Sequence, residues 1–155
     1  MKTITRTVRN EHDKQHLSRY IIGQEGVLTV TIKPGEESRT IKQNRLAFQW
    51  YKDAAEHGDQ TTEQYRCECK LRLGVPILRR DSETFKEKYD STLKSLTYEQ
   101  KLACMGEPFN LPVTSIMKVK QMTEYLEAVQ QHFINQGFML TDPSLLGMYS
   151  WSEWK

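Results

Sequence analysis

Residues 38–45 read Ser38-Arg39-Thr40-Ile41-Lys42-Gln43-Asn44-Arg45 and open a predicted helix that runs from Ile41 to His57. Thr40 is the expected N-cap of this helix, and Gln43 lies three positions after it. In this capping-box spacing, each of the two side chains satisfies a backbone N–H that the first helical turn leaves free. Gly58 follows directly and is the expected helix stop.

Two amides lie on the apolar side of this helix. At about 100° per residue, the apolar side comprises Ile41, Leu46, Ala47, Phe48, Trp50, Tyr51, Ala54 and Ala55. Gln43 and Asn44 fall inside this arc. They either brace the local backbone or face a polar ligand at the helix N-terminus, where free N–H groups and the helix dipole favour anions such as phosphate.

Length and composition indicate one domain of a polar, cytoplasmic protein. The chain has 155 residues, of which 37% are hydrophobic and 27% charged. It has no apolar run of the ~18 residues that a membrane span needs, and residues 1–6 lack the apolar core of a secretory signal. Its cysteines, Cys67, Cys69 and Cys104, are an odd and sparse set that suits a reducing cytoplasm.

The N-terminal third predicts a small sheet covered by one helix. Residues 2–8 and 27–32 are rich in β-branched residues and are predicted to be strands. Between them, Asn10 is the expected cap of a helix from Glu11 to about Ile22, with Leu17, Tyr20 and Ile21 as its buried edge. We therefore expect an α+β fold, in which a strand–helix–strand unit precedes a mainly helical body, in a single domain over residues 1–143.

The helical body is predicted from caps and apolar spacing. One helix starts at Thr61 or Thr62 and stops before Gly74, and Arg79 and Arg80 are assigned to the loop that follows. Further helices are expected from Asp81 or Ser82, from Thr97 through Met105, and from Val119 to Gln136.

The last predicted helix carries a narrow apolar stripe, formed by Val119, Met122, Tyr125, Leu126, Val129 and Phe133. Such a stripe belongs to a core or, less often, to a seam with a partner helix. Residues 144–155 form an aromatic tail that we expect to dock on the body or on a dimer partner, or to offer Trp151 and Trp154 to bases.

Catalytic and metal-binding patterns are weak in this chain. Cys67 and Cys69 point about 200° apart on a helix and cannot share one ion, and His12 and His16 lack the glutamate of a zinc-protease helix. The sequence has no nucleophile elbow, P-loop or dinucleotide-binding glycine motif. We expect no enzyme activity, no catalytic residue, no metal and no cofactor.

Positive charge is concentrated in the first half of the chain. Residues 1–80 carry 15 Lys or Arg against 10 Asp or Glu, whereas residues 81–155 carry 7 against 10. Cations that follow a phosphate backbone, together with aromatic rings that stack on bases, are typical of single-strand binding. The predicted DNA-binding residues are Arg39, Lys42, Gln43, Asn44, Arg45, Arg79, Arg80, Lys118, Lys120, Trp151 and Trp154.

Two blocks of the sequence resemble the NinB (Orf) recombination proteins of lambdoid phages and prophages. Residues 39–45, after an extended Val30-Thr31-Ile32, are similar to the family's Arg-[Ser/Thr]-x-x-Gln-Asn-Arg helix start. Residues 114–119 are similar to its Thr-Ser-x-Met-basic-Val segment before the last long helix. Lys118 matches the basic residue of that segment, while Ile116 stands where the family has an arginine, a place that Lys120 is expected to fill.

The resemblance implies a non-enzymatic homodimer that prefers single-stranded DNA. It implies that the protein helps to load recombinase onto strands covered by single-strand-binding protein, in the cytoplasm of a bacterial host and without a membrane partner. The alternative is a protein–protein adaptor that binds a replication or recombination protein through the 119–136 helix and the aromatic tail.

Overall fold

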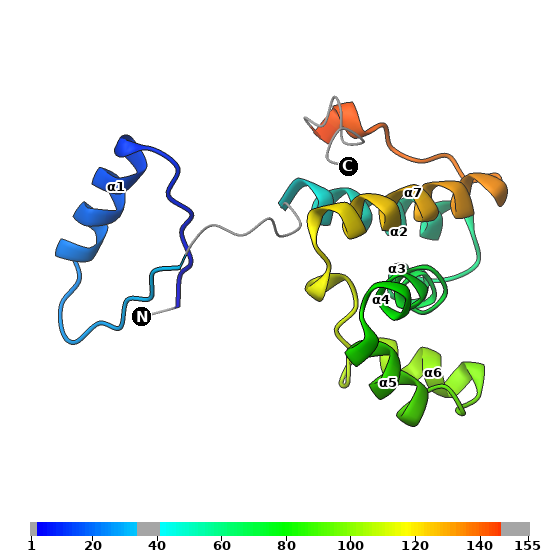
Figure 1. Ribbon diagram of the computed structural model, residues 1–155. Coiled ribbons are helices and arrows are strands. Elements are labelled where there is room, and N and C mark those ends of the chain that lie inside the picture. Colours follow the sequence, from blue (N-terminus) through cyan, green and yellow to red (C-terminus); the bar gives the residue numbers. More distant parts are fainter. Residues whose placement is uncertain (1–2, 34–40, 147–155) are drawn as a thin grey trace. The chain divides into compact units, whose positions relative to one another are not determined.

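The computed structural model describes residues 3–33 and 41–146 and divides the chain into two compact units, Met1–Glu36 and Glu37–Lys155 (Figure 1). The described residues are mainly helical. The boundary between the units follows the predicted strand–helix–strand segment. No helix in the described ranges is long and apolar enough to cross a membrane.

The first unit contains helix α1 (Glu11–Ile22), which has the predicted bounds. Asn10 is its cap, since its side chain accepts a hydrogen bond from the backbone N–H of Asp13 at 2.8 Å. The predicted buried edge is wrong, because no residue of α1 is buried. Local capping chemistry therefore sets the start of this helix without the help of a core.

The predicted N-terminal sheet is wrong: no strand forms within residues 3–33. The segment 27–32 has the composition of a strand, yet Val27 is fully exposed and Ile32 is 92% exposed. Alternating β-branched residues favour extended backbone, but a strand also needs a partner for its backbone groups and an apolar surface to cover one face. Residues 3–33 provide neither, so the described part of the chain is mainly helical and not α+β.

The core of the second unit lies between α2 (Ile41–His57) and α7 (Val119–Asn135), which pack side by side (Figure 1). The α7 stripe is core as expected, since Tyr125, Leu126 and Phe133 have no exposed surface. At the end of the core, the indole Nε1 of Trp50 donates to the backbone oxygen of Thr141 at 2.9 Å. This bond holds the segment after α7 against α2.

Three consecutive helical elements form a continuous rod that lies below this pair in Figure 1. The rod consists of α3 (Thr62–Cys69), the π-helical turn η1 (Lys70–Gly74) and α4 (Val75–Asp81). The predicted stop before Gly74 is wrong, because the chain continues helically into α4. Pro76 lacks an N–H and its ring would clash with the carbonyl four residues earlier in a regular helix. A π turn widens the backbone immediately before it, so the helix accommodates the proline without ending.

Because the rod continues through Asp81, Arg79 and Arg80 lie in α4 and not in the predicted loop. Gly74 has a packing role here, since a Cβ at this position would lie 2.6 Å from Cγ1 of Val113. The missing side chain therefore lets the segment before α7 approach the rod closely.

The remaining elements complete the lower part of the unit. Helices α5 (Glu83–Thr92) and α6 (Tyr98–Met105) begin at caps Ser82 and Thr97, as predicted. Short 3₁₀ turns η2 (Thr114–Ile116) and η3 (Pro143–Leu146) flank α7. The aromatic tail beyond residue 146 lies outside the described residues.

Candidate nucleic-acid interface

Gln43 is buried inside the second unit and joins α2 to α7. It has no exposed surface, and its Nε2 donates to Oγ1 of Thr123 at 3.0 Å. The Thr123 hydroxyl in turn donates to the backbone oxygen of Val119 at 2.9 Å. The sequence left two alternatives for this amide, to brace the local backbone or to face a polar ligand, and its burial supports a bracing role. The partner of Gln43 is a distant helix, and the predicted cap Thr40 lies outside the described residues.

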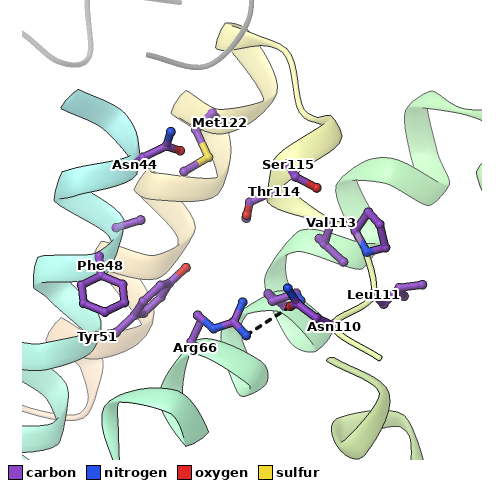
Figure 2. Close-up of a pocket in the computed structure, with 13 residues that line it drawn as sticks. Asn44, Phe48, Tyr51, Arg66, Asn110, Leu111, Val113, Thr114, Ser115 and Met122 are labelled. Carbon is purple, nitrogen blue, oxygen red and sulfur yellow. Dashed lines mark hydrogen bonds between the residues drawn. The ribbon is translucent and has the colours of Figure 1, made fainter. Parts of the chain in front are cut away.

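Asn44 has a different environment from its neighbour. It lines a cleft of about 410 Å³ between α2, the α3–η1 rod and the loop that precedes α7 (Figure 2). Its Oδ1 atom is buried and has no hydrogen-bond partner among the described residues. A buried polar atom without a partner costs free energy, so a ligand that donates a hydrogen bond to it would gain affinity.

Two cations from the rod line the same cleft. Arg66 is held by Glu63 through bonds of 2.8 Å from Nε and 2.7 Å from Nη2, and its Nη2 also reaches Oδ1 of Asn110 at 3.2 Å. Lys70 donates from Nζ to Asn110 Oδ1 at 2.8 Å and to the backbone oxygen of Met105 at 2.5 Å. No carboxylate belongs to the lining of this cleft within the described ranges.

The environment of Lys70 makes its charged form less stable than it is in water. Burial of the ammonium group, followed by the nearby charge of Arg66, lowers the pKa of Lys70 to about 8. Two of its three potential donor hydrogens are used by Met105 and Asn110, so the third is present only when the amine is charged. An anion in the cleft would stabilise that charged form.

On α2, the cleft is lined by an aromatic ring that lies beside a cation. Phe48 belongs to the apolar side of the helix, yet it is 47% exposed and lines the cleft. The ammonium group of Lys52 lies 5.1 Å from the centre of its ring. Arg45 and Lys42 are exposed on the same helix, as the prediction for a DNA-contacting surface requires.

The two arginines of α4 are held by carboxylates. Arg79 is half-buried and forms an ion pair of 2.7 Å with Asp90. Arg80 donates from Nε to Asp81 at 2.7 Å and from Nη1 to Glu124 at 2.6 Å. Asp81 also accepts a hydrogen bond from Nε2 of Gln121 at 3.1 Å. The bond from Arg80, which has the larger effect, and the bond from Gln121 lower the pKa of Asp81 to about 2. The charge of Arg80 is therefore balanced within the protein, and this arginine is a poor candidate for a phosphate contact.

The other predicted site residues lie elsewhere or outside the described ranges. Lys118 and Lys120 are exposed at the N-terminus of α7, where the backbone N–H of Lys118 donates to the side chain of Gln121. Neither lysine lines the cleft. Arg39, Trp151 and Trp154 lie outside the residues that the structure describes.

The structure adds residues to the candidate site. Arg66 and Lys70 belong to the basic region of the sequence but are not among the predicted DNA-binding residues, and nothing in the helical pattern identifies Asn110 or the exposure of Phe48. Within residues 3–33 and 41–146, no group of three or more His, Cys, Asp or Glu side chains could hold a metal ion.

Comparison with known proteins does not assign the chain to a family. It has no significant match to a protein-family model, to a curated protein or to a solved structure.

Proposed function

We propose that this protein binds single-stranded DNA without a catalytic step. The observation that carries the proposal is the α2 cleft, in which an exposed aromatic ring and cations border a buried amide oxygen that lacks a partner. Proteins that bind single strands combine these two kinds of group: cations follow the phosphates and aromatic rings stack on bases.

Each group in the cleft has a role that follows from its position. Phe48 offers a ring face to a base, while Lys52 and Arg45 on the same helix neutralise the adjacent phosphates. Lys70 extends the positive potential into the cleft, whereas the charge of Arg66 is balanced by Glu63. The amide of Asn44 lies deeper and accepts a hydrogen bond from the Watson–Crick edge of a base, which in a duplex is occupied by base pairing.

The biological role is proposed from the resemblance to the NinB (Orf) proteins. In this role, the protein acts as a homodimer in the bacterial cytoplasm and helps to load recombinase onto strands covered by single-strand-binding protein. The motif residues of the resemblance then have different roles: Gln43 braces the helix start, Asn44 lines the cleft and Arg45 is exposed.

The adaptor alternative receives less support from the fold. The apolar stripe of α7 is buried within the second unit, and Leu126, Val129 and Phe133 have no exposed surface. A partner helix cannot use these side chains without opening the core.

Fluorescence anisotropy with a labelled oligonucleotide tests the proposal. Stacking on an aromatic residue contributes roughly 1–3 kcal/mol per base, so Phe48→Ala should weaken binding by about fivefold to more than a hundredfold. Ile134→Ala is the matched control, because Ile134 is 50% exposed on α7 and does not line the cleft. The wild-type protein should prefer single strands to duplex and lose affinity steeply with salt.

Two outcomes would contradict the proposal. One is the absence of binding to either form of DNA at low salt. The other is equal binding by the wild-type protein and Phe48→Ala, which would place the DNA elsewhere.

A further inference from the structure

A second cleft, of about 490 Å³, lies on the part of the rod formed by η1 and α4, where these elements meet α5, the segment after it and α6. Its lining contains cations and tyrosines and, within the described residues, no carboxylate. The lining residues are Leu71, Arg72, Val75, Pro76, Arg79, Tyr89, Lys94, Tyr98 and Lys101.

The floor of this cleft is apolar and its wall carries an exposed ring. Leu71, Val75 and Tyr89 are buried, whereas Tyr98 is 39% exposed. The guanidinium group of Arg72 lies 5.0 Å from the centre of the Tyr98 ring, and its Nε donates to the tyrosine hydroxyl at 3.1 Å. This pair presents a preformed planar surface next to a positive charge, a combination suited to stacking on a base.

Most of the charge in the cleft is available for a ligand. Arg79 is paired with Asp90. Arg72 and Lys94 are exposed, Lys101 is half-buried, and none of the three forms an ion pair with a carboxylate in the described part of the chain. The excess of three cations favours a polyanion.

We propose that this cleft is a second contact surface for the same DNA strand, an inference that rests on the proposed single-strand binding. Lys70 lines the first cleft and Arg72, two residues later, lines the second, so the η1 turn borders both. One strand would contact α2 at Phe48 and the α5–α6 side at Tyr98. An acidic polypeptide would also be attracted by the charge, but it does not use the exposed ring beside Arg72 in the same way.

A charge-matched pair of double variants tests the inference with the full-length protein. Lys94→Ala/Lys101→Ala removes two cations from the cleft, and Lys86→Ala/Lys88→Ala removes two exposed lysines of α5 that do not line it. Each phosphate contact contributes about 0.7 to the salt slope for single strands. The cleft variant should therefore reduce the slope for a long oligonucleotide by about 1.4 and the control variant by much less.

Substitutions of Tyr98 test the stacking contact separately. Tyr98→Ala should weaken binding, and Tyr98→Phe should retain most of it because the ring stays. A strand containing 5-iododeoxyuridine should crosslink to Tyr98 as well as to Phe48 on irradiation, with the positions read by mass spectrometry. Crosslinks confined to α2 would overturn the inference.

The outcomes separate this inference from the proposed function. Equal salt slopes for the two double variants, with binding still lost in Phe48→Ala, would refute the second surface and leave the first. Binding that is lost in Lys94→Ala/Lys101→Ala but kept in Phe48→Ala would place the DNA at the second cleft and refute the first. Displacement of DNA by polyglutamate as effectively as by unlabelled oligonucleotide would overturn the inference in favour of an acidic-protein surface. Absence of binding by the wild-type protein would refute both.

Discussion

Replacement of Gln43 by alanine should destabilise the second unit without changing the chemistry of its surface. Gln43 is fully buried, and its Nε2 bonds to Oγ1 of Thr123 on α7. The lost hydrogen bond contributes about 1 kcal/mol. The space left by the four deleted side-chain atoms adds roughly 1–2 kcal/mol, a value below that for a buried leucine because an amide gains less on leaving water.

The expected loss of stability is therefore about 2–3 kcal/mol for Gln43→Ala. At roughly 2–4 °C per kcal/mol for a chain of this size, the midpoint of thermal unfolding should fall by about 4–12 °C. Arg45→Ala changes an exposed position two residues later and should alter stability by less than about 0.5 kcal/mol. Circular dichroism at 222 nm during heating, combined with urea titration, measures both effects.

A double-mutant cycle isolates the contact between the two helices. Gln43→Met and Thr123→Val keep the approximate volumes of the side chains while removing their polar groups. Each single variant should be destabilised because it breaks the bond between the two side chains, and the double variant should lose about 1 kcal/mol less than the sum of the two single losses. The reasoning would be refuted if Gln43→Ala unfolded at the wild-type temperature and lost DNA affinity, because Gln43 would then be a contact residue.

Three further perturbations have outcomes that follow from the structure. Gly58→Ala should destabilise the second unit by more than about 2 kcal/mol, since its Cβ would lie 1.7 Å from the hydroxyl of the buried Tyr65; thermal unfolding measures this. Acid should weaken the fold through Asp81, because folding lowers the pKa of this carboxyl to about 2. The stabilisation that the charged Asp81 contributes is present above its ordinary pKa of about 4 and is lost as the pH falls from about 4 towards 2. Urea titrations across this range should show a smaller pH dependence for Arg80→Met. Affinity for an oligodeoxyadenylate should fall by up to about tenfold as the pH rises through about 8, since Lys70 then loses its proton, and Lys70→Met should remove this step.

The controls for these perturbations come from the same chain. Gly23→Ala adds a Cβ whose nearest neighbour is the Arg19 oxygen at 3.5 Å, an ordinary contact, so a comparable loss of stability there would contradict the steric explanation for Gly58. An unchanged acid profile in Arg80→Met would show that the hydrogen bonds of Arg80 do not determine the acid sensitivity. A step near pH 8 that survives in Lys70→Met would assign it to another group.

Helix starts could be predicted from the sequence because they depend on residues three positions apart. The capping boxes of Thr61 with Gln64 and of Thr97 with Gln100 are both present, and α2 runs from Ile41 to His57 as predicted. The same local chemistry explains why α1 has its predicted bounds although it buries nothing.

The errors arise where the outcome depends on distant groups. The segment 27–32 has strand composition, but a strand requires a partner that the sequence pattern does not identify. The brace at Gln43 depends on Thr123, which lies 80 residues away, and no periodicity connects the two. The pairing of Arg80 with Glu124 likewise follows from the contact between α4 and α7, so a basic cluster in the sequence overstates the free charge of the folded surface.

The π turn before Pro76 makes the length of the rod critical. Val75 donates its backbone N–H to the carbonyl of Lys70, five residues earlier, so this turn holds one residue more than a regular helix would. Deleting one residue here would leave a regular helix, in which the ring of Pro76 clashes with the carbonyl four residues earlier, so α4 would have to bend and its ion pair between Arg79 and Asp90 would be strained. Homologous chains should therefore conserve the number of residues between Thr62 and Asp81 even where the side chains differ.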